Sequence, residues 1–282
     1  PSRGLGDVYK RQLLCEENTQ QKEIDIQKAN KWYHKLWKNI VRYCIKGEGT
    51  TTTKDTENSI EDWKRQAETY LKKSVENNPK GRYHQNLGAY YAAIRDYDKA
   101  LEQYKLAFNA EKRDDKIYNL IGSVLLYRAE MKLGISERFQ KGIVLSEITL
   151  DKIDEEERLN IQNDIKQAYE WLNLAIKQVN PIINAYYNYS KACIYDSLFL
   201  GGGSQKMSEA DKYLNTVEII WNMNDSQKPK GYLYTRRNYW EANKEYDKAL
   251  EINQVIMKVD NSGDAKTAER VYDSKKRNKN NG

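Results

Sequence analysis

Residues 81–112 constrain the fold more than any other stretch, because two sets of apolar residues recur there at helical spacing, separated by a short turn. These apolar positions are Leu87, Tyr91 and Ile94 in the first segment and Ala100, Tyr104, Ala107 and Phe108 in the second. Gly88 and Ala100 are small where two packed helices must approach closely. A single helical hairpin cannot bury its apolar face alone, so we expect neighbouring segments to supply further hairpins.

This stretch resembles a tetratricopeptide repeat (TPR), in which a Leu-Gly pair and an aromatic residue on one helix precede small and large apolar residues on the next. The residues that carry the resemblance are Leu87, Gly88, Tyr91, Ala100, Tyr104 and Ala107. Residues 245–251 repeat the sequence of residues 96–102 with one replacement of Asp by Glu, which indicates duplication. The resemblance implies an all-α, TPR-like α-solenoid whose concave groove binds a peptide segment of a partner protein.

The same pattern continues more loosely over residues 24–260, where we expect four to five helical hairpins with insertions. Their expected spans are about residues 24–80, 81–114, 115–181, 182–222 and 229–260. The fifth hairpin has Arg236-Arg237 where the Leu-Gly pair is expected, which predicts a degenerate repeat that acts as a polar cap. Residues 261–282 are rich in Asn, Lys, Gly and Ser and are expected to form a disordered basic tail.

The amino-terminal residues 1–12 are expected to be foreign to the protein. Residues 7–12 resemble the in-frame translation of a transposon end used to build sequencing libraries, and the chain begins without Met. We therefore interpret residues 1–12 as a read-through scar and the chain as a fragment, and leave them out of the fold. A signal peptide or a further domain would then lie upstream of Leu13.

The formal net charge of +6 lies mostly at the two ends of the chain. Residues 1–12 carry +2 and residues 261–282 carry +3, which leaves about +1 for the body. Nucleic-acid-binding proteins concentrate Lys and Arg on the folded face that meets phosphate, so this distribution argues against a nucleic-acid partner. No stretch approaches the roughly 18 consecutive apolar residues of a membrane-spanning helix.

Histidine and cysteine, which often carry catalysis or bind metals, are scarce, with two and three residues. Cys15, Cys44 and Cys193 are widely spaced and predict neither a disulfide framework nor a zinc site, which favours a reducing compartment such as the cytoplasm. The two histidines belong to no catalytic motif, and His84 falls at a packing position. The acidic run 154–157 is expected to start a helix rather than to bind a metal. We expect no enzyme activity and no cofactor.

The groove positions of the family, carried over to this sequence, give the candidate peptide-binding residues. They are Lys31, His34, Lys38 and Arg42 in the first hairpin, Arg82, Gln85 and Asn86 in the second, Lys116, Asn119 and Tyr127 in the third, Asn184, Tyr187, Lys191 and Tyr195 in the fourth, and Tyr234, Asn238 and Glu241 in the fifth. The cationic first half predicts a partner with an acidic segment or a free carboxylate. The Tyr and Asn residues of the second half suit a peptide backbone or a sugar.

Three alternatives stay open at this point. The groove could be a solvated polar face without a fixed ligand. The Tyr and Trp content also suits a glycan-binding helical-repeat lipoprotein of a bacterial surface. Finally, the chain could be the recognition arm of an enzyme whose catalytic domain lies upstream.

Asn86 and Lys116 match two positions of the clamp with which some TPR proteins bind a terminal carboxylate. Leu120 replaces the Arg of that clamp, which predicts an incomplete clamp.

Overall fold

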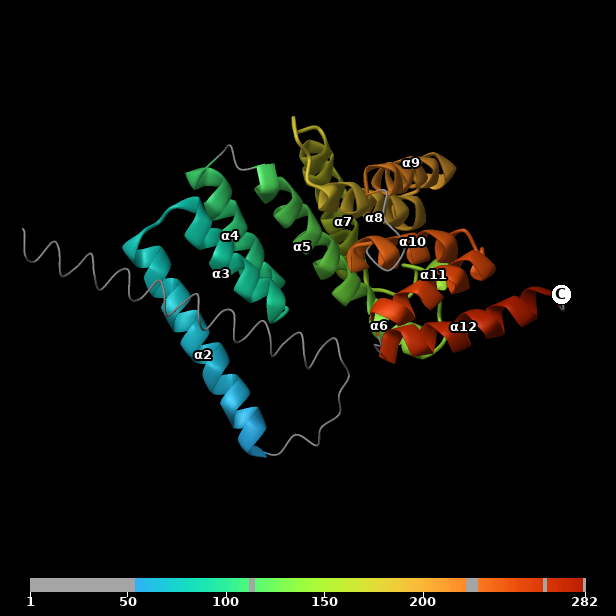
Figure 1. The fold of residues 1–282 in the computed structure, drawn as a ribbon, viewed down its shortest axis with the longest axis horizontal. Coiled ribbons are helices and arrows are strands. Elements are labelled where there is room, and N and C mark those ends of the chain that lie inside the picture. Colours follow the sequence, from blue (N-terminus) through green and yellow to red (C-terminus); the bar gives the residue numbers. More distant parts are fainter. Residues whose placement is uncertain (1–53, 112–114, 222–227, 261–262, 281–282) are drawn as a thin grey trace, which may run out of the picture. The chain divides into compact units, whose positions relative to one another are not determined.

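The structure, a computed structural model, describes residues 54–111, 115–221, 228–260 and 263–280, and every regular element in these ranges is a helix (Figure 1). The chain divides into two compact units, whose described parts are residues 54–111 and the three ranges from residue 115 onwards. Within each unit, helices that follow one another along the chain pack together. The all-α, repeat-like class is therefore confirmed. The expected scar at residues 1–12 and the first helix of the first hairpin lie outside the described residues.

The described part of the first unit contains three helices in succession, α2 (Lys54–Asn77), α3 (Gly81–Ala93) and α4 (Tyr97–Ala110). Helix α3 packs against both α2 and α4. The Asp96 side chain accepts a hydrogen bond from the Lys99 backbone N–H at 3.2 Å and caps the start of α4. A Cβ added to Gly88 would lie 2.6 Å from Cε1 of Tyr104, so α3 and α4 can approach this closely only because residue 88 is glycine.

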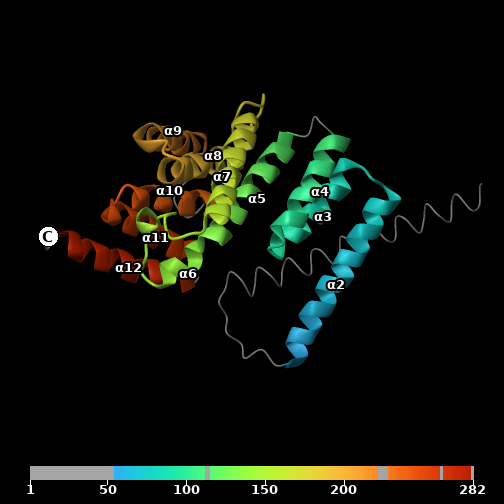
Figure 2. The same cartoon turned by 180° about the vertical axis from the view of Figure 1, so that it is seen from behind.

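The second unit contains eight α-helices of the described chain, together with one 3₁₀ turn (Figure 2). They are α5 (Asp115–Leu133), α6 (Ile135–Gln140), the 3₁₀ turn η2 (Leu145–Glu147), α7 (Glu155–Ile176), α8 (Ile183–Phe199), α9 (Gly203–Trp221), α10 (Lys230–Ala242), α11 (Tyr246–Val259) and α12 (Gly263–Asn280). Helix α5 packs on α7, α8 packs on α7, α9 and α10, and α11 packs on α10 and α12. Asp154 caps α7 by accepting from the Glu157 N–H at 2.9 Å, which confirms that the acidic run starts a helix.

Tyrosine supplies many of the largest buried side chains. Those that are fully buried are Tyr90, Tyr104, Tyr189, Tyr195, Tyr232 and Tyr272. Several of their hydroxyls donate to a glutamate on a neighbouring helix: Tyr189 donates to Glu209 at 2.6 Å, and Tyr272 to Glu241. A buried phenol needs such a partner, because an unpaired hydroxyl in the core costs free energy. Helix packing thus accounts for much of the tyrosine content of this chain.

The prediction that the fifth hairpin ends the array as a polar cap is wrong. Arg236 and Arg237 are both buried, with 7% and 5% of their surface exposed. Arg236 reaches Asp211 at 2.5 Å on α9, while Arg237 reaches Asn253 at 3.0 Å on α11 and Asp264 at 3.1 Å on α12. The two guanidinium groups therefore join α10 to α9 on one side and to α11 and α12 on the other. These polar partners offset the free energy that each buried guanidinium loses when it leaves water.

The prediction of a disordered carboxy-terminal tail is also wrong. Residues 263–280 form α12, and its buried residues Ala265, Ala268, Val271 and Tyr272 recur at helical spacing. The polar composition of this segment conceals a narrow apolar stripe of two alanines, a valine and a tyrosine. That stripe packs against α11 and the insertion before α7, so the segment has enough buried surface to fold.

Candidate functional site

The candidate binding face of the second unit is formed by α5, α8 and α10, which carry the predicted groove residues. Helix α8 lies beside both α5 and α10. Along α8 the candidates recur at intervals of three and four residues, so they lie on one side of the helix. We call this surface the central face and define it by Lys116, Asn119, Tyr127, Asn184, Tyr187, Lys191, Tyr234 and Asn238.

Contacts between the helices show that the structure brings several of these residues together. The Asn188 amide donates to the Asn119 side-chain oxygen at 2.9 Å, which links α8 to α5. The Lys191 ammonium lies 5.1 Å from the centre of the Tyr127 ring and pairs with Glu130. A Cβ on Gly231 would lie 2.8 Å from the Tyr187 ring, so this glycine lets the ring lie against α10. The central face is therefore continuous across three helices.

The exposure of the candidate residues separates those that a ligand could reach from those that it could not. Lys116 and Asn184 are exposed, and Tyr127 exposes 42% of its surface. Tyr187, Lys191, Tyr234 and Asn238 are half-buried, and Asn119 is buried. Tyr195 and Glu241 are buried as well, and the Tyr195 hydroxyl donates to Glu130. Those two residues serve packing in the structure, where the sequence placed them in the groove.

The first unit holds three of the candidates on α3. Arg82 is exposed, and Gln85 and Asn86 are half-buried. His84 is buried, with its Nδ1 2.9 Å from the Gln103 side-chain oxygen, so this histidine occupies a packing position as predicted. The four candidates of the first hairpin, Lys31, His34, Lys38 and Arg42, lie outside the described residues.

An insertion between α5 and α7 bounds the central face at one end. The sequence predicted an insertion at this place but not its contact with α10. We call residues 143–151 the strap. The Leu145 backbone N–H donates to the Glu241 carboxylate on α10, and residues 148–151 line a hollow together with Leu198 and Phe199 at the end of α8. The apolar residues Val144, Leu145 and Ile148 could have indicated this packing from the sequence, because a loop exposed to solvent rarely contains several large apolar residues.

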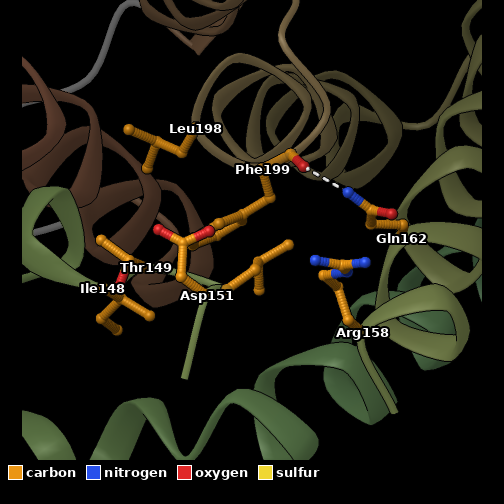
Figure 3. A pocket seen from close by; sticks show the side chains of 8 residues that line it. Ile148, Thr149, Asp151, Arg158, Gln162, Leu198 and Phe199 are labelled. Carbon is orange, nitrogen blue, oxygen red and sulfur yellow. Dashed lines mark hydrogen bonds between the residues drawn. The ribbon is translucent and has the colours of Figure 1, made fainter. Parts of the chain in front are cut away.

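The hollow beside the strap has a volume of about 520 Å³ (Figure 3). Asp151 comes to it from the strap and Arg158 from α7, with Leu198 and Phe199 from α8. The Gln162 amide donates to the Phe199 carbonyl at 3.1 Å and is thereby occupied. One acid and one guanidinium among apolar side chains can bind a small polar group, but they do not form a nucleophile and base pair.

Glu241, which binds the strap, is expected to make the free energy of unfolding depend on pH. Burial raises the pKa of this carboxyl above its ordinary value of about 4.3, and the hydrogen bonds from Tyr272 and Leu145 offset the effect only in part. The folded state therefore binds the proton more tightly than the unfolded state does. The stabilisation is fully present below the ordinary pKa and is lost as pH rises through the raised one.

We expect Glu241→Gln to remove this dependence. The free energy of unfolding of the variant, minus that of the wild type, should rise as the pH increases above the ordinary pKa of a glutamate, because only the wild type has to ionise a buried carboxyl. Urea unfolding at a series of pH values measures the difference. Glu170→Gln on the exposed side of α7 is the control, and a difference that stays constant with pH would contradict the assignment.

Other kinds of site find little support among the described residues. The described residues contain no group of three His, Cys, Asp or Glu side chains placed to hold a metal ion. Burial raises the pKa of the Cys193 thiol well above its usual range, so this cysteine is not an activated nucleophile. None of the described helices is long and apolar enough to cross a membrane. The chain matches no family model, and no curated protein matches it.

Proposed function

We propose that this protein is a non-enzymatic interaction module, a TPR-like α-solenoid that binds an extended peptide segment of a partner protein on the central face. The observation that carries the proposal is the packing of α8 against both α5 and α10, the other two helices of the central face. Asn188 of α8 meets Asn119 of α5, and Tyr187 of α8 lies against Gly231 of α10. A row of amide and phenol groups along three helices suits a chain that crosses them.

The chemistry of the row favours recognition of a peptide backbone. An asparagine amide both donates and accepts hydrogen bonds, so Asn184 and Asn238 can pair with the carbonyl and N–H groups of an extended chain. Tyrosine offers a large contact surface with few rotatable bonds, which keeps the entropic cost of binding low. Glu130 neutralises Lys191, so the middle of the row carries little net charge.

Preference for an acidic partner would come from the cationic residues among the candidates. Arg82 in the first unit and Lys116 in the second are exposed, and the proposal assigns the same role to Lys31, His34, Lys38 and Arg42. These residues would steer an acidic segment toward the groove and would add charge-assisted hydrogen bonds. Glycan binding is less well supported, because stacking on a sugar needs exposed rings and six of the tyrosines are fully buried.

A library of random linear peptides, selected on the full chain, tests the proposal. We expect enrichment of peptides that bind the wild type, and about a tenfold loss of affinity for the double variant Tyr127→Ala/Asn184→Ala, because both side chains are accessible on the central face. Glu170→Ala on α7 is the control. Acidic peptides are then compared with neutral scrambled versions, and with the Arg82→Ala variant.

Two results would count against the proposal. One is a selection that yields no peptide above background. The other is a set of enriched peptides that bind the double variant as tightly as the wild type, which would place their site elsewhere. Equal binding of acidic and neutral peptides would remove only the charge preference. Because the replaced side chains are exposed or partly exposed, the melting temperature of each variant should stay close to that of the wild type.

A further inference from the structure

A second hollow lies between α12 and the end of α6, and its lining is dominated by cations. It has a volume of about 450 Å³. Lys141, Arg270 and Lys275 line it together with the uncharged hydrogen-bonding groups of Gln140, Thr267 and Ser274. No carboxylate is among the residues that line it. Glu147 pairs with Lys275, so two cations unpaired within the described chain remain, and a concave surface with such cations and no lining acid attracts anions.

The hollow exists because the insertion folds back onto the last helix, and α6 lies beside α12 in both views of the fold (Figures 1 and 2). The rings of Phe139 and Tyr272 are both buried, with their centres 5.9 Å apart, and they hold the two segments together. The Glu147 carboxylate binds the Lys275 ammonium at 2.6 and 2.7 Å. Two segments more than 120 positions apart thus form a single site, and one of its cations is fixed in place.

The other two cations are available to a ligand. Lys141 and Arg270 are exposed, and within the described chain neither has an ion-pair partner. The Arg270 guanidinium offers a planar fork of N–H donors, and the Lys141 ammonium offers up to three donors. Thr267 and Ser274 are three and four residues from Arg270 along α12, so their hydroxyls lie on the same side of the helix as its fork.

We propose that this hollow binds a phosphate monoester group. A phosphate presents three terminal oxygens and close to two negative charges, which matches the Arg270 guanidinium, the Lys141 ammonium and two hydroxyls better than a carboxylate with two oxygens does. The group could belong to a small phosphate ester or to a phosphorylated side chain of a partner. The site is separate from the central face, so it does not rest on the proposed peptide groove.

Binding of inorganic phosphate and of a labelled peptide, in phosphoserine and unmodified forms, tests this site on the full chain. At about 0.15 M salt, where exposed charges are screened, we expect the phosphoserine form to bind about tenfold more tightly than the unmodified form, and inorganic phosphate to displace it. If inorganic phosphate binds and neither peptide does, the natural ligand is a small phosphate ester rather than a phosphorylated protein, and the phosphate site itself is supported. If neither phosphate nor the phosphopeptide shows saturable binding, the proposal fails.

Charge-matched variants distinguish a defined site from general attraction. Arg270→Ala and Lys141→Ala should each weaken phosphate binding about tenfold, since each removes charge-assisted hydrogen bonds. Lys266→Ala removes the same charge from an exposed position of α12 outside the lining, and it should change the affinity less than about twofold. Equal losses in all three variants would overturn the proposal. Tyr127→Ala/Asn184→Ala should leave phosphate binding unchanged, so the failure of one site is separable from that of the other.

Discussion

Replacing Asp164 with Ala is expected to lower the free energy of unfolding by about 3–5 kcal/mol. Asp164 on α7 exposes 1% of its surface and joins α7 to two cations of α5. Arg128 binds it through two N–H groups, at 3.0 and 2.5 Å, and the Lys132 ammonium lies 3.1 Å away. Without the carboxylate, both partly buried cations lose the counter-charge that Asp164 supplies. Urea unfolding followed by circular dichroism measures the loss.

Two further variants sharpen this test. Asp164→Asn keeps one hydrogen-bond acceptor and should lose less than Asp164→Ala. Glu170→Ala, on the exposed side of the same helix, should stay within about 0.5 kcal/mol of the wild type. A loss below about 1 kcal/mol for Asp164→Ala would mean that the two cations rehydrate freely, and that this group does not hold α5 to α7.

Arg237→Ala is expected to cost a similar amount, about 3–4 kcal/mol. The Arg237 side chain is 6% exposed, and its guanidinium lies 4.9 Å from the Tyr234 ring centre and 5.5 Å from that of Phe139. Truncation leaves the Asn253 oxygen without its donor and opens a cavity between α10, α11 and α12. Thermal and urea unfolding both report this loss.

Arg237→Lys and Arg277→Ala are the comparison variants. Lysine keeps the charge but lacks the planar fork that reaches Asn253 and Asp264 together, so its loss should be intermediate. Arg277 is exposed on α12, and its truncation should be nearly neutral. If Arg237→Ala unfolded at the same urea concentration as the wild type, Arg237 would be tolerated at this position of the repeat without stabilising the packing of α10 against α11 and α12.

Local spacing was enough to predict the all-helical class and the positions of several helices. Leu87, Gly88 and Tyr104 act over one hairpin, and their packing follows from the periodicity of two adjacent helices. The acidic start of α7 was predictable for the same reason, because capping is decided within four residues. The candidates on α8 could be placed on one face from their spacing alone.

What the sequence did not reveal depends on partners far away along the chain. Arg236 and Arg237 look like surface residues until Asp211, Asn253 and Asp264 are brought to them by neighbouring helices. Tyr195 occupies a groove position by count, yet it is buried. Half of the buried apolar residues of α12 are alanines, which the composition of this segment does not reveal as part of a core. In each case tertiary contacts outweigh the local pattern.

The strap changes how the second unit can assemble. In an array of repeats each hairpin interacts only with its neighbours, so one end can form or fray while the rest stays folded. Here Leu145 and Glu241 are 96 positions apart, and Glu147 and Lys275 are 128 positions apart. During synthesis the apolar residues of the strap therefore stay uncovered until α10 and α12 have left the ribosome. Helix α12, made long after the strap, completes the packing of the third hairpin, which raises the contact order of the unit and slows its folding.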